Sequence, residues 1–301
     1  MRRYWLIAFA IVAFGHDTRA SPVSDCRQEE DLKLAINGCS ALIAQEPGDA
    51  AAYTLRGDAY RATGDLTRAS ADYAKAIEIN PRDAEAYYRR GTIYRKQNNA
   101  GRAVEDYTKA VELDPKLYGA YFARAEIYRA KGDLVRALSD YDAAIGINPR
   151  ATWAYLSRGA VYQAKGDAGR AIADFTKVIE INPRGADAYF ARANIFRGMG
   201  SFAKAIADYT RAIENRPKDA DAYNNRAWAY YSTGDPVRAL EDAGRALELR
   251  PYDADALDTR GHALEMLGRR AEAILDYKKA IRLNPDIESS KEALKRLGAN
   301  H

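Results

Sequence analysis

Histidines and cysteines, which often bind transition metals or act as catalytic bases and nucleophiles, are few in this chain. The 301 residues include three histidines and two cysteines. His16 and His301 lie near the two ends and His262 stands alone, so no spacing suits a metal site. We expect His262 to be a surface or groove residue. The sequence therefore predicts no metal ion, no other cofactor and no enzyme activity.

One glycine pattern matches the loose form of a dinucleotide-binding fingerprint. Gly198 and Gly200 begin the run Gly-Met-Gly-Ser-Phe-Ala. The fingerprint binds a cofactor only where the glycines follow a strand and open a helix. No strand is expected before Gly198, so we attach no cofactor to the pattern. A phosphate-binding loop and a serine–histidine arrangement are also missing from the sequence.

The two cysteines, Cys26 and Cys39, lie close together near the N-terminus. An even number of cysteines in an exported chain favours a disulfide. If residues 26–39 formed one helix, the sulfurs would lie about 20 Å apart at ~1.5 Å per residue. A bridge therefore requires the chain to turn back near residues 29–31. The alternative is a pair of buried thiols.

The first twenty residues have the composition of an export signal. Arg2 and Arg3 precede eleven apolar residues at 4–14. Ala20 and the small residue two places before it then suit cleavage by a signal peptidase after Ala20. A membrane-spanning helix needs roughly 20 apolar residues, so this segment is short for an anchor. We expect cleavage after Ala20, with an uncleaved anchor or a misassigned start as alternatives. Cleavage predicts a periplasmic or secreted protein without an integral membrane segment, from a Gram-negative type of bacterium.

Composition sets limits on the partners of the mature chain. The full sequence has 46 basic and 42 acidic residues, a small net charge of +4, and without residues 1–20 the balance is 43 to 41. Such a mixed surface does not provide the basic footprint that nucleic acid or anionic lipid requires. The hydrophobic residues, at 47%, are ample for a folded core.

A proline returns every 34 residues from Pro47 to Pro285 and sets the register of a repeat. Seven full units then begin at residues 50, 84, 118, 152, 186, 220 and 254. In each unit, places four, eight and eleven share one helix face, and places twenty, twenty-four and twenty-seven share another. Small residues at places eight and twenty let rings of the facing helix approach. Each unit therefore predicts a helical hairpin. The twenty-fourth places are Tyr73, Tyr107, Tyr141, Phe175, Tyr209, Ala243 and Tyr277.

The turn inside each unit has its own signal. Six units place glycine there and the second places Asn98, which are the residues that a left-handed helix cap favours. The repeating proline follows the second helix and stops it, because proline cannot continue the hydrogen-bond ladder.

Two charged places repeat without exception. The seventh place is always arginine and the twenty-third is always aspartate. Both lie eight residues from the fifteenth place, which is the turn, so they stand at the same height in an antiparallel hairpin. We expect a repeated structural ion pair, with a charged ligand track as the alternative. The arginines are Arg56, Arg90, Arg124, Arg158, Arg192, Arg226 and Arg260, and the aspartates are Asp72, Asp106, Asp140, Asp174, Asp208, Asp242 and Asp276.

This pattern resembles the tetratricopeptide repeat family over residues 50–285. The resemblance implies an all-α fold, an α-solenoid in which stacked hairpins form a right-handed superhelix with a concave groove. It also implies a boundary at each end. We expect a signal at 1–20, a capping half-repeat with the disulfide at 21–49, seven repeats at 50–287, and a capping helix with a tail at 288–301.

In the family, the concave wall is formed by the first helix of each unit. In this chain the residues at these groove places differ from unit to unit, whereas the core places repeat similar residues. Aromatic residues flanked by arginines are typical of binding hot spots; the alternative is that the rings pack against the next hairpin. Asn194 and Asn225 resemble asparagines that grip a peptide backbone in carboxylate-clamp members. The clamp's basic residues are absent, with Phe190, Asp255 and Thr259 in their places. The predicted groove residues are Tyr88, Phe122, Trp153, Phe190, Asn194, Asn225, Trp228, Arg95, Arg129 and Arg197.

Three functional hypotheses follow. The leading one is a non-catalytic scaffold that holds a peptide or partner protein in the groove. A second is an envelope-assembly or secretion adaptor that works through the convex face or through self-association. A third is the regulatory subunit of a separate enzyme. We expect a monomer or weak self-association, and the last units to turn acidic at Asp221, Asp255, Asp258 and Glu265.

Overall fold

The computed structural model describes residues 21–28 and 30–299, and these residues form helices without any strand. The chain divides into two compact units, the first ending at Ala120 and the second beginning at Tyr121. The predicted export signal lies outside the described residues. Among the residues that are described, no helix combines the length and the hydrophobicity needed to cross a membrane.

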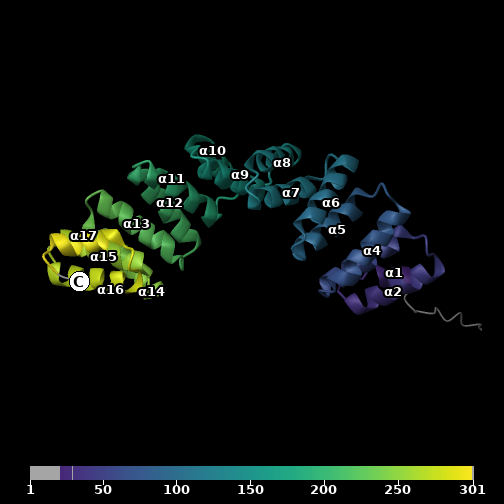
Figure 1. The fold of residues 1–301 in the computed structure, drawn as a ribbon, viewed down its shortest axis with the longest axis horizontal. Helices are drawn as coiled ribbons and strands as arrows, with labels where there is room; N and C mark the ends of the chain where they lie inside the picture. Colours follow the sequence, from purple (N-terminus) through teal and green to yellow (C-terminus); the bar gives the residue numbers. More distant parts are fainter. Residues whose placement is uncertain (1–20, 29, 300–301) are drawn as a thin grey trace, which may run out of the picture. The chain divides into compact units, whose positions relative to one another are not determined.

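The first unit contains six helices, which pair in chain order (Figure 1). A short helix packs on its successor at the start, and two helical hairpins follow. The helices are α1 (Pro22–Cys26), α2 (Leu32–Gln45), α3 (Ala50–Ala62), α4 (Leu66–Ile79), α5 (Ala84–Lys96) and α6 (Ala100–Leu113).

The second unit continues the same alternation and closes with a single helix that packs on the last hairpin. The first of its helices, α7, begins just before the boundary between the units. The helices are α7 (Tyr118–Ala130), α8 (Leu134–Ile147), α9 (Thr152–Ala164), α10 (Ala168–Ile181), α11 (Ala186–Gly198), α12 (Phe202–Asn215), α13 (Ala220–Ser232), α14 (Pro236–Leu249), α15 (Ala254–Met266), α16 (Arg270–Leu283) and α17 (Glu288–Arg296). The predicted all-α solenoid fold is confirmed.

The turns within the hairpins have the predicted left-handed conformation. Gly64 has a φ of +85°, and Asn98 is the one non-glycine residue with a positive φ, at 59°, in the described part of the chain. Each second helix is followed by a cap residue and then by the repeating proline, as at Asn80 and Pro81 after α4. These two local signals fix the hairpin length.

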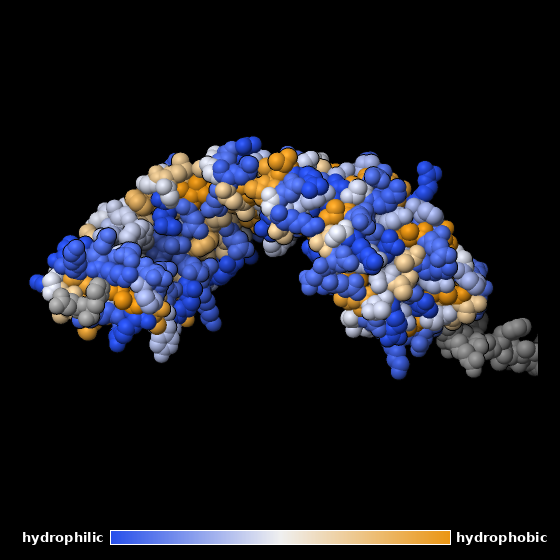
Figure 2. Space-filling view, viewed as in Figure 1, coloured by the Kyte–Doolittle hydropathy of each residue, from blue (hydrophilic) through white to orange (hydrophobic). Residues whose placement is uncertain are grey.

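The core of six of the seven hairpins is a ring from the second helix that lies on a small residue of the first, and Ala243 takes the place of the ring in the hairpin of α13 and α14. Tyr73, Tyr107 and Tyr277 are fully buried. A Cβ atom added at Gly261 would lie 2.6 Å from Cε1 of Tyr277. Because that distance is shorter than any ordinary contact, glycine at 261 lets α15 and α16 approach at this spacing, whereas Ala125, Ala193 and Ala227 take the same place in three other hairpins. Outside this core, the surface in view is mainly hydrophilic, with small hydrophobic areas between (Figure 2).

The repeated arginine and aspartate form a bidentate ion pair in all seven hairpins. Nε and Nη2 of each arginine donate to the two carboxylate oxygens over 2.6 to 2.9 Å. Only 5 to 9% of each aspartate side chain is exposed. Charges so deeply buried are not available to a ligand, so the ion-pair interpretation is confirmed over the ligand track.

The same arginines also connect successive hairpins. Nη1 of Arg192 donates to Oγ1 of Thr176 over 2.8 Å, and Nη1 of Arg226 donates to Oγ1 of Thr210 over 3.0 Å. In both cases the acceptor is on the second helix of the preceding hairpin. Aromatic rings at the fourth and eleventh places lie beside the guanidinium, as Tyr223 and Tyr230 do beside Arg226 at 5.7 and 5.9 Å.

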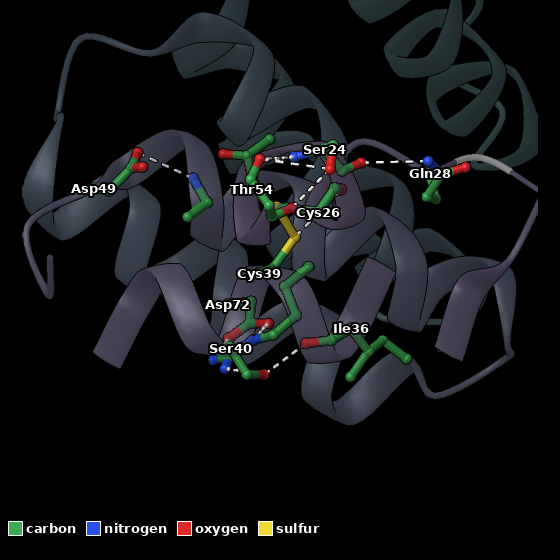
Figure 3. Close-up of a disulfide and its surroundings, with 12 residues drawn as sticks. Ser24, Cys26, Gln28, Ile36, Cys39, Ser40, Asp49, Thr54 and Asp72 are labelled. Atoms are coloured by element: carbon green, nitrogen blue, oxygen red, sulfur yellow. Dashed lines mark hydrogen bonds and ion pairs between the residues drawn. A yellow bond between two sulfur atoms is a disulfide. The ribbon is translucent and has the colours of Figure 1, made fainter. Parts of the chain in front are cut away.

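The N-terminal cap of the first unit is held by the disulfide Cys26–Cys39, whose Cα atoms are 4.4 Å apart. It joins α1, which ends at Cys26, to α2, which begins at Leu32 (Figure 3), so the two cysteines are not on one helix, as the bridge requires. A Cβ atom at Gly38 would lie 2.5 Å from the backbone nitrogen of Cys26. Glycine there lets α1 rest directly on α2. The predicted domain limits at residues 20, 49 and 287 stay a prediction.

Candidate functional site

The first-helix face of the second unit is the surface at the fifth, ninth and twelfth places of α7, α9, α11, α13 and α15. The same places in the first unit include Tyr88 and Arg95 on α5. In the second unit the fifth places are Phe122, Leu156, Phe190, Asn224 and Asp258, the ninth are Glu126, Ala160, Asn194, Trp228 and His262, and the twelfth are Arg129, Gln163, Arg197, Tyr231 and Glu265.

Aromatic rings at the fifth places are half-buried. The ring centroid of Phe122 lies 6.0 Å from that of Tyr141, and the ring of Phe190 lies 5.9 Å from Tyr209. In the first unit Tyr88 lies 5.9 Å from Tyr107. Each ring therefore packs on the core tyrosine of its own hairpin, rather than on the next hairpin alone. The remaining surface of each ring stays open to a ligand.

Side chains at the ninth place form hydrogen bonds with the core tyrosine of the same hairpin, which the sequence analysis did not predict. The hydroxyl of Tyr209 donates to Oδ1 of Asn194 over 2.6 Å, and Tyr141 donates to Glu126. Where the core ring is Phe175, which has no hydroxyl, the ninth place is Ala160. A buried hydroxyl needs a partner, so the twenty-fourth residue dictates the ninth. Comparing these two places along the chain would have revealed the rule.

The two predicted asparagines lie together. Nδ2 of Asn225 donates to Oδ1 of Asn194 over 3.3 Å, and the same oxygen accepts the hydroxyl of Tyr209. Oδ1 of Asn194 is therefore already occupied. The side-chain atoms Oδ1 of Asn225 and Nδ2 of Asn194 are in no hydrogen bond in the described part of the chain, so they are available to a ligand.

Three polar atoms of this face are buried without a hydrogen bond in the described part of the chain, and one of them, Nε2 of His262, faces Asp258. The other two are Nε of Arg197 on α11 and Oδ1 of Asn224 on α13. One is a donor and the other is an acceptor. Leaving such a group unpaired costs about 1–3 kcal/mol, so each calls for a partner.

The remaining arginines of the predicted groove differ from Arg197. Arg95 and Arg129 are exposed. Arg129 donates to Glu126 over 2.8 Å. Burial would raise the pKa of Glu126, but hydrogen bonds from Arg129, Tyr141 and Ser157 outweigh it and hold that pKa below its ordinary value. Glu126 therefore ionises more readily than an ordinary glutamate.

The two predicted tryptophans occupy different surroundings. Trp153 on α9 is 69% exposed, which is unusual for so large an apolar side chain. Trp228 on α13 is half-buried, with its ring 5.2 Å from Tyr231 and 5.8 Å from His262. Trp228 and Tyr231 thus form one aromatic cluster, from which Trp153 is separate in sequence by two hairpins.

His262 is buried, so its prediction as a surface or groove residue is wrong. Only 8% of it is exposed. Nδ1 lies 3.0 Å from the hydroxyl of Tyr277, and Nε2 lies 3.5 Å from Oδ2 of Asp258. As in the other hairpins with a core tyrosine, the residue at the ninth place is a hydrogen-bond partner of that tyrosine.

The acidic end of the face is occupied by the closing helix α17. Ser289 and Ser290 both donate to Asp258, and Arg296 donates to Glu265 over 3.0 and 2.8 Å. Hydrogen bonds from Arg296 and Tyr277 hold the pKa of Glu265 below its ordinary value. Two of the four predicted acidic groups are therefore used to dock α17, and Asp221 pairs with Arg250.

Family models described as TPR repeat match residues 57–98 and 125–166. Models described as tetratricopeptide repeat match residues 84–117, 106–139, 154–184, 190–256 and 254–287. Together they leave few residues unmatched between 57 and 287. No curated protein matches the chain in sequence.

Several solved structures share the fold. A tetratricopeptide repeat protein from Parabacteroides merdae is 25% identical, with a TM-score of 0.57, over 83% of this chain and 98% of that one. YrrB, described as a TPR protein with an unusual peptide-binding site, is 25% identical, with a TM-score of 0.56, over 62% of this chain and 95% of its own. PilF from Pseudomonas aeruginosa has a TM-score of 0.61 at 17% identity, over 72% of this chain and 100% of its own, and shows the fold alone.

Proposed function

Because the chain belongs to the tetratricopeptide repeat family, whose members are protein-interaction scaffolds, we propose that the first-helix face of its second unit binds an extended segment of a partner protein. YrrB, which has the same fold, is described as peptide-binding. The proposed role is non-catalytic, since holding a peptide requires no reacting group.

The observation that carries the proposal is the pair of unpartnered polar atoms, Nε of Arg197 and Oδ1 of Asn224. The backbone of an extended peptide presents an N–H and a C=O at every residue except proline. Asn224 would accept from the first and Arg197 would donate to the second. The open groups of Asn194 and Asn225 have the same complementary chemistry.

Apolar contacts would supply the rest of the affinity. Phe122, Leu156 and Phe190 are half-buried at three successive fifth places. Rings that are already fixed against a core lose little freedom on binding, so their open surface contributes to affinity at low entropic cost. The Trp228–Tyr231 cluster adds a second apolar area on α13. Aromatic residues with a neighbouring arginine have the composition of interface hot spots.

We also propose that the protein works in an oxidising compartment, such as the periplasm. The Cys26–Cys39 bridge is the observation that supports this location, since structural disulfides persist mainly outside the reducing cytosol.

The test is capture of a partner from an envelope extract by immobilised protein. We expect the double variant Phe122→Ala/Phe190→Ala to lose capture by at least about ten-fold, because two hot-spot rings are removed. Ala160→Lys is a second variant, at an exposed place of α9, that adds a charge to the face without removing any packing. It should also reduce capture.

Matched control substitutions belong on the second helices. Lys177→Ala on α10 and Arg211→Ala on α12 remove exposed groups that pair only with Glu180 and Glu214 of their own helices. These controls should capture the partner normally. If the face variants retain capture and the controls lose it, the partner binds the opposite surface and the proposal is wrong. Circular dichroism spectra would confirm that all variants are folded.

A further inference from the structure

A cavity of about 630 Å³ opens at the start of the first unit, between α1, α2 and α3. Its volume lies in the range of about 300–1,000 Å³ that is typical of ligand pockets. Leu32 and Leu55 contribute apolar walls, and Arg27, Asp58, Arg61 and Arg89 contribute charged groups. No residue of this cavity belongs to the first-helix face of the second unit.

The cavity exists because the capping pair is smaller than a full hairpin. α1 has 5 residues, whereas α3 has 13. Cys39 stands 34 residues before the core ring Tyr73, and Cys26 stands 34 residues before Tyr60. A cystine therefore takes the places of two aromatic rings. The short helix and the smaller core residues leave space that a full hairpin would fill.

The lining of the cavity has an excess of positive charge. Three arginines face one aspartate, which gives a net charge of +2. Asp58 accepts from Arg89, from Arg61 over 3.4 Å, and from the hydroxyl of Tyr73 over 2.8 Å. This carboxylate is shared among several donors, and Nη2 of Arg89 also lies 3.1 Å from Oε1 of Glu85, which does not line the cavity.

Three arginines of the cavity have guanidinium donors to spare. Nε of Arg89 is buried and has no hydrogen bond in the described part of the chain. Arg27 is exposed at the rim. Arg61, with 39% of its side chain exposed, contacts Asp58 over 3.4 Å and also interacts with the hydroxyl of Tyr73. Guanidinium donors arranged around an apolar hollow match an anionic group that has an apolar stem.

We propose that this cavity binds a carboxylate carried on a short apolar stem. Arg27, Arg61 and Arg89 would donate to the carboxylate, and Leu32 and Leu55 would contact the stem. Two sources have this chemistry, namely the C-terminal residue of a peptide and an acidic side chain next to an apolar residue. The site is a second ligand site, beyond the face to which we assign the partner segment.

Three N-acetylated peptide probes test the proposal by isothermal titration calorimetry with the full chain. The first is the peptide Gly-Ser-Gly-Ala-Leu with a free C-terminal carboxylate, the second is the same peptide with a C-terminal amide, and the third is the amidated peptide Gly-Ser-Leu-Glu-Leu. We expect the first, the third or both to bind, and the neutral amide to bind at least about ten-fold more weakly. Binding by the first identifies a chain end as the source, and binding by the third identifies an acidic side chain.

Substitutions then place the binding site. Arg61→Gln and Arg27→Gln should each weaken binding of the carboxylate probe by about ten-fold, because each removes a charged donor. Arg95→Gln is the matched control, since Arg95 stands at the place of Arg61 in the next hairpin, is exposed, and does not line the cavity. The control should bind normally, as should Phe122→Ala/Phe190→Ala.

The proposal is overturned if the neutral amide binds as tightly as the carboxylate probes, if no carboxylate probe binds, or if Arg27→Gln and Arg61→Gln bind unchanged. Because the variants of the second unit leave this cavity intact, failure here is distinguishable from failure of the proposed partner face. Circular dichroism of Arg61→Gln would confirm its fold.

Discussion

Asp242→Ala should destabilise the second unit by about 3–5 kcal/mol, whereas removal of both members of the pair should cost clearly less. Asp242 accepts two hydrogen bonds from Arg226, at 2.7 and 2.8 Å, and 8% of its side chain is exposed. Deleting the carboxylate leaves Arg226, of which 15% is exposed, as an uncompensated buried charge. Urea unfolding followed by circular dichroism, with amide exchange in α13 and α14, would measure the effect.

The matched double variant is Arg226→Met/Asp242→Leu, which replaces the pair with apolar side chains of similar volume. Such replacements of buried pairs are often neutral or stabilising. Thr210, the second hydrogen-bond partner of Arg226, is only partly buried and loses one hydrogen bond. We therefore expect the double variant to be more stable than Asp242→Ala.

The exposed pair Arg216–Asp187 provides the control, with side chains 49% and 58% exposed. Arg216→Ala should change stability by less than about 1 kcal/mol, because exposed pairs contribute little. If Asp242→Ala costs as little as this control, the buried arginine is not stranded by loss of its partner. The structural account of the repeated pair would then fail.

Reduction of the Cys26–Cys39 disulfide should remove about 3 kcal/mol from the stability of the N-terminal cap. The bridge closes a loop with a sequence separation of 13 residues, and α1 is too short to persist alone. Reduction to two thiols barely changes the volume of the cysteine side chains and creates no cavity. The loss of stability therefore arises because the unfolded chain is no longer constrained by the bridge. Hydrogen exchange of amides in α1 and α2, with and without a thiol reductant, would measure it.

Two controls separate the bridge from general effects of the reductant. Amides of α13 and α14 in the second unit should exchange at the same rate in both conditions. The variant Cys26→Ala/Cys39→Ala should show fast exchange in α1 that no longer responds to reductant. Unchanged protection of α1 and α2 after complete reduction would contradict the prediction.

The repeat made most of the fold predictable, because its signals are local and occur seven times. Gly64 and Asn98 specify left-handed turns by their residue type alone. The pairing of Arg226 with Asp242 follows from their equal distance from a turn. Neither inference needs knowledge of contacts between distant parts of the chain.

The candidate site was predicted less well, because its polar residues depend on partners that lie in other helices. Asn194 and His262 look like free groove residues in the sequence, yet each hydrogen-bonds the core tyrosine fifteen residues later. Asp258 and Glu265 look like an acidic patch, yet they dock α17. Unpaired groups such as Nε of Arg197 become visible only when all neighbouring donors and acceptors are placed.

Site-specific photo-crosslinking tests the central claim, binding of a partner segment to the first-helix face, most directly. Benzoylphenylalanine would replace Gln163, an exposed twelfth-place residue of α9, and in a second protein Lys177, an exposed residue of α10. We predict that irradiation in envelope extract yields an adduct at position 163 and none at position 177. An adduct at 177 without one at 163 would contradict the claim and place the partner on the second helices.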